Sequence, residues 1–211
     1  MKAQNTKLVG LAAAVLAVLS AGCGDVATNG RSPVMAVVSM MEAASGAEPS
    51  QWGTVLSSDV QTIVEQTIDG EQVRVPTVFG DNGRVTLRLT LRDPGVPGVP
   101  ASPSPLNEVT FTRYRVSYSR ADGRNTPGVD VPHPFDSTVT FTVPAEGSIT
   151  APFMLVRITA KEEAPLRALI TNEVIVSTMA EVTFYGRDQA GNDVIATGTI
   201  GVFFGNFGDP T

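Results

Sequence analysis

The sequence has little of the chemistry on which most enzymes and metal sites depend. Among its 211 residues there are one cysteine, one histidine and one tryptophan, and aromatic residues make up only 6% of the chain. Zinc sites use three or four Cys or His ligands, and hydrolytic triads need a histidine to carry the proton. The one histidine, His133, lies between two prolines, a pattern typical of a stiff loop. We therefore expect no bound metal, no cofactor and no enzyme activity.

Charge is also scarce and mostly acidic. Only 17% of the residues are charged, and the formal net charge is -6 at pH 7. Nucleic-acid binding depends on clustered Lys and Arg side chains, so we expect no nucleic-acid partner. After Lys2 and Lys7 the only lysine is Lys161, which Glu162 and Glu163 follow directly. This arrangement favours a solvated ion pair at the end of a strand over a catalytic Ser–Lys dyad.

Cys23 follows the only long aliphatic run of the sequence, residues 8–19. The run is shorter than the about 20 residues that a membrane-spanning helix needs, and it begins after basic residues, which is typical of an export signal. It leads into Ser-Ala-Gly-Cys, and this ending resembles the lipobox of bacterial lipoproteins, although Ser20 stands where that family most often has leucine. The resemblance implies a lipoprotein signal peptide (residues 1–22) that is removed, and a lipid such as palmitate on Cys23.

A lipid on Cys23 would anchor the protein to a membrane of the cell envelope, with its body outside the cytoplasm. Residues 23–33 are small and polar, and they predict the lipidated cysteine and a short tether. Gly24 favours the outer membrane where a cell has two membranes. The alternative is a secreted protein with an unpaired thiol, but lipidation accounts for that cysteine.

The remaining residues, 34–211, carry frequent strand signals. Residues 84–92 alternate without a break between apolar and polar side chains, as a strand with one face in the core and one in water does. Residues 60–66 and 73–79 flank Asp69-Gly70, a dipeptide that tolerates the positive φ of a tight hairpin turn. These two patterns predict a strand and a hairpin.

The other elements follow from weaker patterns. Residues 109–120 predict a strand whose apolar positions change parity, which indicates either a β-bulge near Thr112 and Arg113 or a strand that passes between sheets. Proline-rich residues 93–105 predict a long loop, and residues 162–169 a helix broken by Pro165. Further strands are expected at residues 34–39 (followed by a helical turn that Gly46 ends), 138–143, 153–160, 172–177, 181–187 and 194–204. About 8–9 strands in residues 34–211 favour one β-sandwich domain.

The closing hairpin, residues 181–192, carries the turn sequence Asp-Gln-Ala-Gly-Asn and resembles the last hairpin of bacterial Ig-like domains, where turns of the form D-x-A-G-N recur. Residues 120–132 and 204–210 also resemble a group of uncharacterised bacterial lipoproteins. These resemblances imply an all-β fold with a single Ig-like β-sandwich, and no particular activity. The chain departs from antibody-type domains in having no cysteine pair and in carrying Trp52 in an early loop.

Calcium is the ion that the sequence accommodates best, because several acidic residues fall in predicted loops and hard cations take several oxygen ligands. No segment matches an EF-hand, however, and aspartate suits turns for backbone reasons alone, so we favour structural turns over metal ligands. The residues concerned are Asp81, Asp122, Asp130, Asp136, Asp188, Asp193 and Asp209.

The function that these features favour is a lipid-anchored, extracytoplasmic, non-catalytic module that binds a partner or builds the envelope. Its partner, besides the membrane reached through the lipid, would be an envelope protein or a glycan. The alternative is a hydrolase or a carbohydrate-active or accessory protein whose site is built from loops.

Phe203 and Phe207 are the candidate partner surface. In the closing strand, Ile200, Val202 and Phe204 share one face, so Phe203 should point to the other, and Phe207 follows just beyond the strand. Exposed aromatic residues are enriched at interaction sites. The alternative is that another segment covers this second face and that both rings pack as satellite core.

Overall fold

The computed structural model describes residues 31–207, and within this range the protein is all-β. Most of these residues lie in strands, with one short α-helix and two 3-10 helices between them. In chain order the elements are β1 (Val34–Ala44), β2 (Val55–Asp59), β3 (Thr62–Ile68), β4 (Glu71–Thr77), β5 (Asp81–Leu91), β6 (Gly95–Val96), β7 (Val99–Pro100), η2 (Pro105–Asn107), β8 (Val109–Ser119), β9 (Phe135–Val143), β10 (Ser148–Val156), α3 (Ile158–Glu162), η3 (Leu166–Ile170), β11 (Val176–Asp188) and β12 (Asp193–Gly205).

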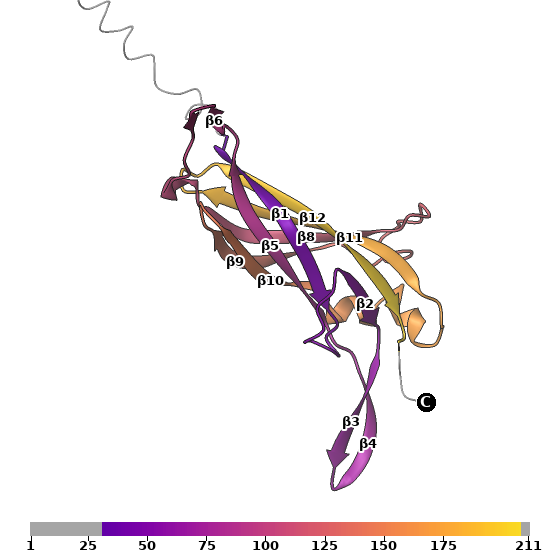
Figure 1. The fold of residues 1–211 in the computed structure, drawn as a ribbon. Coiled ribbons are helices and arrows are strands. Elements are labelled where there is room, and N and C mark those ends of the chain that lie inside the picture. The colour runs from indigo at the N-terminus through magenta and orange to yellow at the C-terminus, as the bar shows by residue number, and fades with distance from the viewer. Residues whose placement is uncertain (1–30, 208–211) are drawn as a thin grey trace, which may run out of the picture.

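Eight of the described strands form two sheets (Figure 1). The smaller sheet has three strands in the order β1-β5-β10, and the larger has five in the order β2-β12-β11-β8-β9. Neighbouring strands are antiparallel, except that β2 pairs in parallel with β12 at one edge of the larger sheet. The short β2 is therefore the place where the early part of the chain joins the closing strands.

The apolar faces of the two sheets meet in a core rich in aromatic rings. Phe153 on β10 packs edge-on against Phe184 on β11 and Tyr114 on β8, with ring centroids 5.3 and 5.5 Å apart. The Tyr114 hydroxyl also donates a hydrogen bond to the main-chain oxygen of Met154 at 3.0 Å. Edge-to-face ring pairs add to the area that they bury, so these contacts hold the smaller sheet against the larger one.

Strand β5 confirms the alternation that the sequence predicts for residues 84–92. Val85 and Leu87 are completely buried, and Arg88 between the apolar positions is exposed. The strand pairs with β1 on one side and β10 on the other, so its backbone groups are bonded along both edges. It is the central strand of the smaller sheet.

Strand β8 contains the predicted bulge. Its pairing with β9 and with β11 shifts between Phe111 and Arg113, so Thr112 is the extra residue. The shift returns the apolar side chains to the core face, and Phe111 before the bulge is as fully buried as Val116 after it. The strand stays within the larger sheet throughout, so the alternative of a strand passing between sheets is wrong.

The predicted hairpin around Asp69-Gly70 is confirmed, with both turn residues at positive φ. Strands β3 and β4 pair from Thr62 opposite Thr77 to Ile68 opposite Glu71. The proline-rich residues 93–105 form an exposed loop, as predicted, within which β6 and β7 make a two-residue ladder.

Several element boundaries were predicted wrongly. Strand β1 continues to Ala44 instead of turning helical after Ser39, because β5 pairs with it as far as Asn82 opposite Ala44. The separate strand predicted at residues 172–177 is absent from the described chain, since Val176 begins the long strand β11.

The region after β9 differs as well. Strand β10 lies at Ser148–Val156 rather than at residues 153–160, and α3 follows it directly. The helix predicted at residues 162–169 is two short pieces, α3 and η3, that lie on either side of Pro165. Pairing with β5 determines where β10 begins, and β5 is distant from β10 in the sequence.

Candidate functional site

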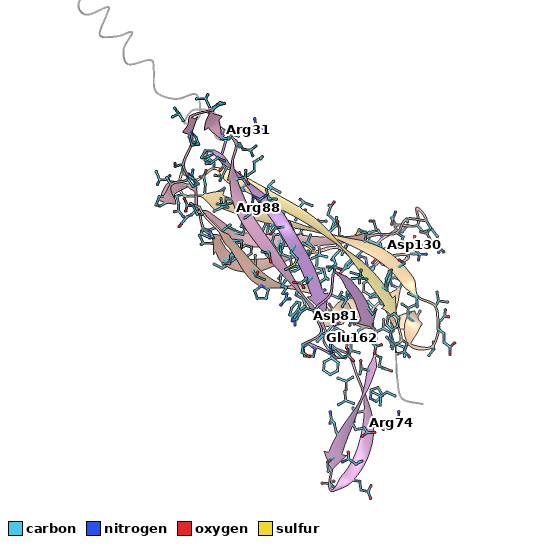
Figure 2. The ribbon with its side chains drawn as sticks, viewed as in Figure 1. Arg31, Arg74, Asp81, Arg88, Asp130 and Glu162 are labelled. Carbon is cyan, nitrogen blue, oxygen red and sulfur yellow. The ribbon has the colours of Figure 1, made fainter. Side chains whose placement is uncertain are left out.

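The hairpin of β3 and β4, residues 62–77, projects from the two sheets, and we call it the arm. Figure 1 shows both strands extending beyond the body, and Figure 2 shows Arg74 on the arm and Arg31 at the opposite end of the molecule. Arg31 lies near the β6–β7 loop (Figure 2). Pro33, two residues after it, accepts a hydrogen bond at 2.8 Å from the main-chain N–H of Arg92, which comes just before that loop. The first described residues therefore lie at one end of the body, and the arm projects from the other end.

The arm is a strand pair that lies outside the two sheets of the described chain. Within the described chain, β3 and β4 pair only with each other. Ile68 and Val73 are 47% and 38% exposed, and every residue from 65 to 74 is on the surface. A two-stranded hairpin by itself is marginally stable in water, and a strand at the edge of a sheet can pair with another extended chain. The arm is therefore suited to strand addition by a partner.

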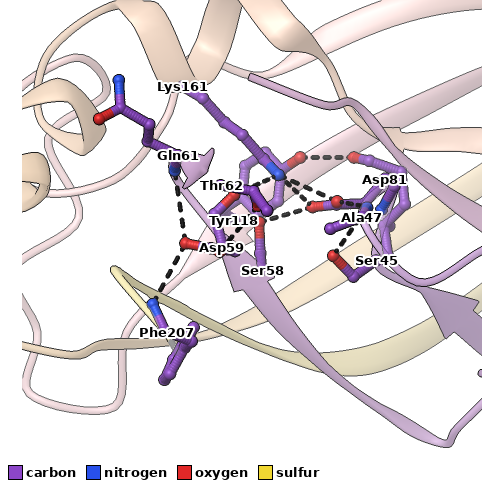
Figure 3. A network of polar contacts seen from close by, with 12 residues as sticks. Ser45, Ala47, Ser58, Asp59, Gln61, Thr62, Asp81, Tyr118, Lys161 and Phe207 are labelled. Carbon is purple, nitrogen blue, oxygen red and sulfur yellow. Dashed lines mark hydrogen bonds and ion pairs between the residues drawn. The ribbon is translucent and has the colours of Figure 1, made fainter. Parts of the chain in front are cut away.

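A buried polar cluster, formed by Ser58, Asp59, Asp81 and Lys161, fixes the root of the arm (Figure 3). The Lys161 Nζ atom lies 2.9 Å from each carboxylate oxygen of Asp81 and donates to the main-chain oxygen of Asp59 at 2.7 Å. The Ser58 hydroxyl donates to Asp81 Oδ2 at 2.6 Å. Ser58 and Asp59 end β2 just before the arm, and Asp81 begins β5 just after it, so the cluster joins both ends of the arm to the body.

Asp59 extends the cluster toward the end of the described chain. Its carboxylate accepts hydrogen bonds from the Thr62 hydroxyl at 2.9 Å and from the main-chain N–H of Phe207 at 3.1 Å. Thr62 is the first residue of β3. The first strand of the arm and the segment after β12 are therefore held by one carboxylate.

The expected solvated ion pair at Lys161 is wrong. Its side chain is 1% exposed and is paired with Asp81, which is 0% exposed, rather than with its neighbours in the sequence. Because Ser58 is also completely buried, no outside substrate reaches its hydroxyl. The cluster is an internal feature of the fold, in which three oxygen atoms of Asp59 and Asp81 surround the three N–H donors of the lysine.

Phe203 lies where the sequence predicts, on the outer face of β12. It is 37% exposed, whereas its neighbour Phe204 is completely buried. With Val55, Ile175 and Met179 it lines an open groove of about 820 Å³ on the larger sheet. Gly201 stands between Val55 and Met179 in the strand register and has no side chain to fill the space between them. We call this hollow the Phe203 groove.

Phe207 lies in a neighbouring hollow rather than in the Phe203 groove. It is half-buried and lines a space of about 430 Å³ together with Leu169 and Asn206. Ile175 borders both hollows, so the two phenylalanines are close to one another on the surface without lining one groove. Strand β2 connects the Phe203 groove to the arm, since Val55 lines the groove and the arm begins three residues after Asp59.

The aspartates predicted to lie in loops are dispersed, and the prediction is wrong for Asp81 in β5 and Asp136 in β9, because pairing with distant strands includes them in the sheets. Within residues 31–207, no group of three or more His, Cys, Asp or Glu side chains is placed to hold a metal ion. Asp122 pairs with two arginines, Asp136 with Arg115 and Asp193 with Arg187. Asp130 accepts from the main-chain N–H of Thr126, and Asp209 lies outside the described residues.

Two of these carboxyls show how local donors set acidity. The side chain of Arg120 is the main reason that the pKa of Asp122 is lowered to about 2. Burial raises the pKa of Asp188, but hydrogen bonds from the side chain and main chain of Asn192 and from other donors outweigh it, so the pKa is lowered overall. Asp188 opens the D-x-A-G-N turn and accepts from the N–H of both Ala190 and Asn192. Both carboxylates therefore stabilise loops.

Comparison of the chain with models of protein families, with curated proteins and with solved structures gives no significant match in any of the three. Cys23 lies outside the described residues. No helix among the described residues is long and apolar enough to cross a membrane.

Neither the projection of the arm from the body nor the buried cluster was predictable from the sequence. Its hairpin was predictable from Asp69-Gly70, but an unpaired hairpin and one packed in a sheet have the same local pattern. Ser58, Asp81 and Lys161 are far apart in the sequence. Only Lys161 was conspicuous there, because lysine is rare in this chain.

Proposed function

We propose that the protein is a lipid-anchored, extracytoplasmic and non-catalytic binding module, built on an Ig-like β-sandwich, that binds an envelope protein through its arm. The single observation that carries this proposal is the projecting hairpin, which joins neither of the two sheets of the described chain. Exposed apolar side chains on the arm, Ile68 and Val73, offer contacts beyond main-chain pairing.

The position of the arm fits an anchored protein. Between Cys23 and Arg31 the chain can extend by at most about 30 Å, at ~3.3–3.6 Å a residue. With a lipid on Cys23, the end of the body that carries Arg31 would stay close to the membrane surface, and the arm would point away from it (Figure 2). A partner in the envelope would then meet the arm first.

The Phe203 groove would extend the binding surface. It adjoins the root of the arm through β2, and Val55, Ile175, Met179 and Phe203 form an apolar part of its lining, beside polar residues that include Arg120 and Asp122. Aromatic residues and methionine are enriched in the buried centres of protein interfaces. The binding surface at this end of the molecule would therefore combine strand edges on the arm with apolar side chains beside its root.

Arm replacement tests the binding role. Replacing residues 65–74 by Asn-Gly would join Val64 to Val75 through a two-residue turn, and it removes only surface residues. We expect an unchanged melting temperature and loss of a specific envelope protein that the wild type captures. A control variant, Ile195→Ser, changes an exposed residue at the far end of β12 and should retain capture. Equal capture by the arm variant and the wild type would contradict the proposal.

Anchoring is tested separately. Wild-type protein should incorporate radiolabelled palmitate in its native cell, and Cys23→Ser should remain uncleaved and unlabelled. Equal labelling of the two proteins would refute lipidation at Cys23 without bearing on the arm.

Glycan binding is a second candidate, which one groove favours. On the outer face of the larger sheet, away from the arm, a hollow of about 730 Å³ is lined by Tyr185, Arg113, Gln189 and Asp193. The Arg113 guanidinium lies 4.1 Å above the Tyr185 ring, which places an aromatic face among polar groups. If a glycan array shows binding, Tyr185→Ala should abolish it, and binding that survives this change would rule out the groove.

A further inference from the structure

Lys161 is an exception to the way in which this chain uses cationic side chains. Of its 15 Lys and Arg residues only Lys2, Lys7 and Lys161 are lysines, so every other cation after Lys7 is arginine. Arginine is the usual choice for a buried ion pair, because its planar fork bonds a carboxylate at two points and is weakly hydrated. Lysine differs in carrying a primary amine that can lose its proton and act as a nucleophile. The chain thus uses its last lysine at a buried carboxylate.

The two side chains are held in contact and away from water. Lys161 Nζ lies 2.9 Å from both Asp81 oxygens, so the carboxyl carbon that joins these oxygens is within the ~3–3.5 Å of a near-attack arrangement. Asp81 is 0% and Lys161 1% exposed. Among the described residues, Lys161 is also the only buried cationic side chain. Figure 3 shows the amine directed at the carboxylate from α3.

We propose that Lys161 and Asp81 condense to an intramolecular isopeptide bond. One proton first passes from the ammonium to the carboxylate with which it is in contact, which leaves a neutral amine beside a carboxylic acid. The Nζ lone pair then forms a bond to Asp81 Cγ, and the Cγ–Oδ2 bond breaks. Oδ2 leaves as water with the carboxyl proton and one amine proton. The products are one amide and one water molecule, so no oxidant, reductant or cofactor takes part.

Two donors on the carboxyl group suit this step. The main-chain N–H of Gly46 donates to Oδ1 at 2.9 Å, where negative charge develops in the tetrahedral intermediate. The Ser58 hydroxyl is bonded to Oδ2, the oxygen that leaves, and can pass it a proton. A Cβ atom at position 46 would collide with the carbonyl oxygen of Gly80, so glycine allows this close approach. The carboxyl therefore has an oxyanion donor on one oxygen and a hydroxyl on the other.

The cross-link would tie α3 to the first residue of β5, two elements that are far apart in the sequence. A covalent link of this kind restricts the unfolded chain, as a disulfide does. With a single cysteine the chain cannot form an internal disulfide. The amide would lock the root of the arm whatever the arm binds, so this inference is independent of the proposed function.

Tryptic peptide mapping of the full-length protein separates the two states. Trypsin cleaves after Lys and Arg but not after an acylated lysine. A cross-linked protein therefore yields residues 158–167 joined to residues 75–84, lighter than the sum of the two peptides by one water molecule. A free Lys161 yields residues 158–161, residues 162–167 and an unbranched 75–84 peptide. We expect the branched peptide, and recovery of the linear peptides alone would overturn the proposal.

A matched variant checks the assignment. Lys161→Arg keeps a cation beside Asp81, but its guanidinium does not form this amide, so the branched peptide should vanish and cleavage after residue 161 should return. A mass deficit of one water that persists in Lys161→Arg would place the modification elsewhere and overturn the proposal. If this variant fails to fold, the map of the wild-type protein decides by itself.

Discussion

Phe203 and Phe204 are neighbours on β12, and substituting each in turn separates the surface of the larger sheet from its core. Phe204 is completely buried, and its ring packs edge-on against Tyr118 with centroids 5.7 Å apart. Truncating a core phenylalanine costs about 3–5 kcal/mol, because the lost contacts leave a cavity that the surroundings only partly fill. We expect Phe204→Ala to lower the free energy of unfolding by that amount.

Phe203→Ala should cost much less. Complete burial of a large apolar side chain is worth about 1.5–3 kcal/mol, so a ring that is 37% exposed should lose ~1–2 kcal/mol. Urea titrations of both variants, followed by circular dichroism at neutral pH, measure the two losses. If Phe203 also belongs to the partner surface, its variant should capture less partner than the wild type. Equal losses of stability in the two variants would place Phe203 in the core and refute its role at an interface.

Two further outcomes follow from local contacts. The pKa of Asp188 is lowered from its ordinary value of 3.8, so the stability that its carboxylate contributes is complete above that value and is lost as the pH falls through the lower, folded-state pKa. Urea midpoints taken at about pH 6 and about pH 3 should therefore differ less in Asp188→Asn than in the wild type. An identical pH dependence of the two proteins would contradict this role of the carboxylate. Gly83→Ala should destabilise by about 1–3 kcal/mol, because its Cβ would overlap the ring of Phe153, and an unchanged urea midpoint would mean that the ring moves aside freely.

The strands were predicted best where the local pattern of apolar residues matches the face that the folded protein buries. The alternation in β5 and the parity change in β8 are both imposed by a single buried face, and both appear in the structure. The turn at Asp69-Gly70 was predictable because its backbone conformation restricts the residue types that fit.

Predictions failed where a distant partner decides the conformation. Residues 40–44 are apolar enough for helix or strand, and pairing with residues 82–86 of β5 makes them a strand. The two glutamates after Lys161 indicated a surface residue. Its burial depends on an ion pair with Asp81, which begins β5 and is 80 residues earlier in the chain. The exposure of Phe203 could be inferred from the period of two, but the groove around it depends on β2 and β11 as neighbours of β12.

Site-specific photo-crosslinking in cells tests the role of the arm most directly. A photoreactive residue at position 73 lies on the arm, and one at position 195 lies at the far end of β12, where the native side chain is more exposed than that of Val73. We predict a discrete protein adduct from position 73 that purified wild-type protein competes away and that protein with residues 65–74 replaced by Asn-Gly does not. No adduct from position 73, or the same adduct from both positions, would contradict the proposal that the arm binds a partner.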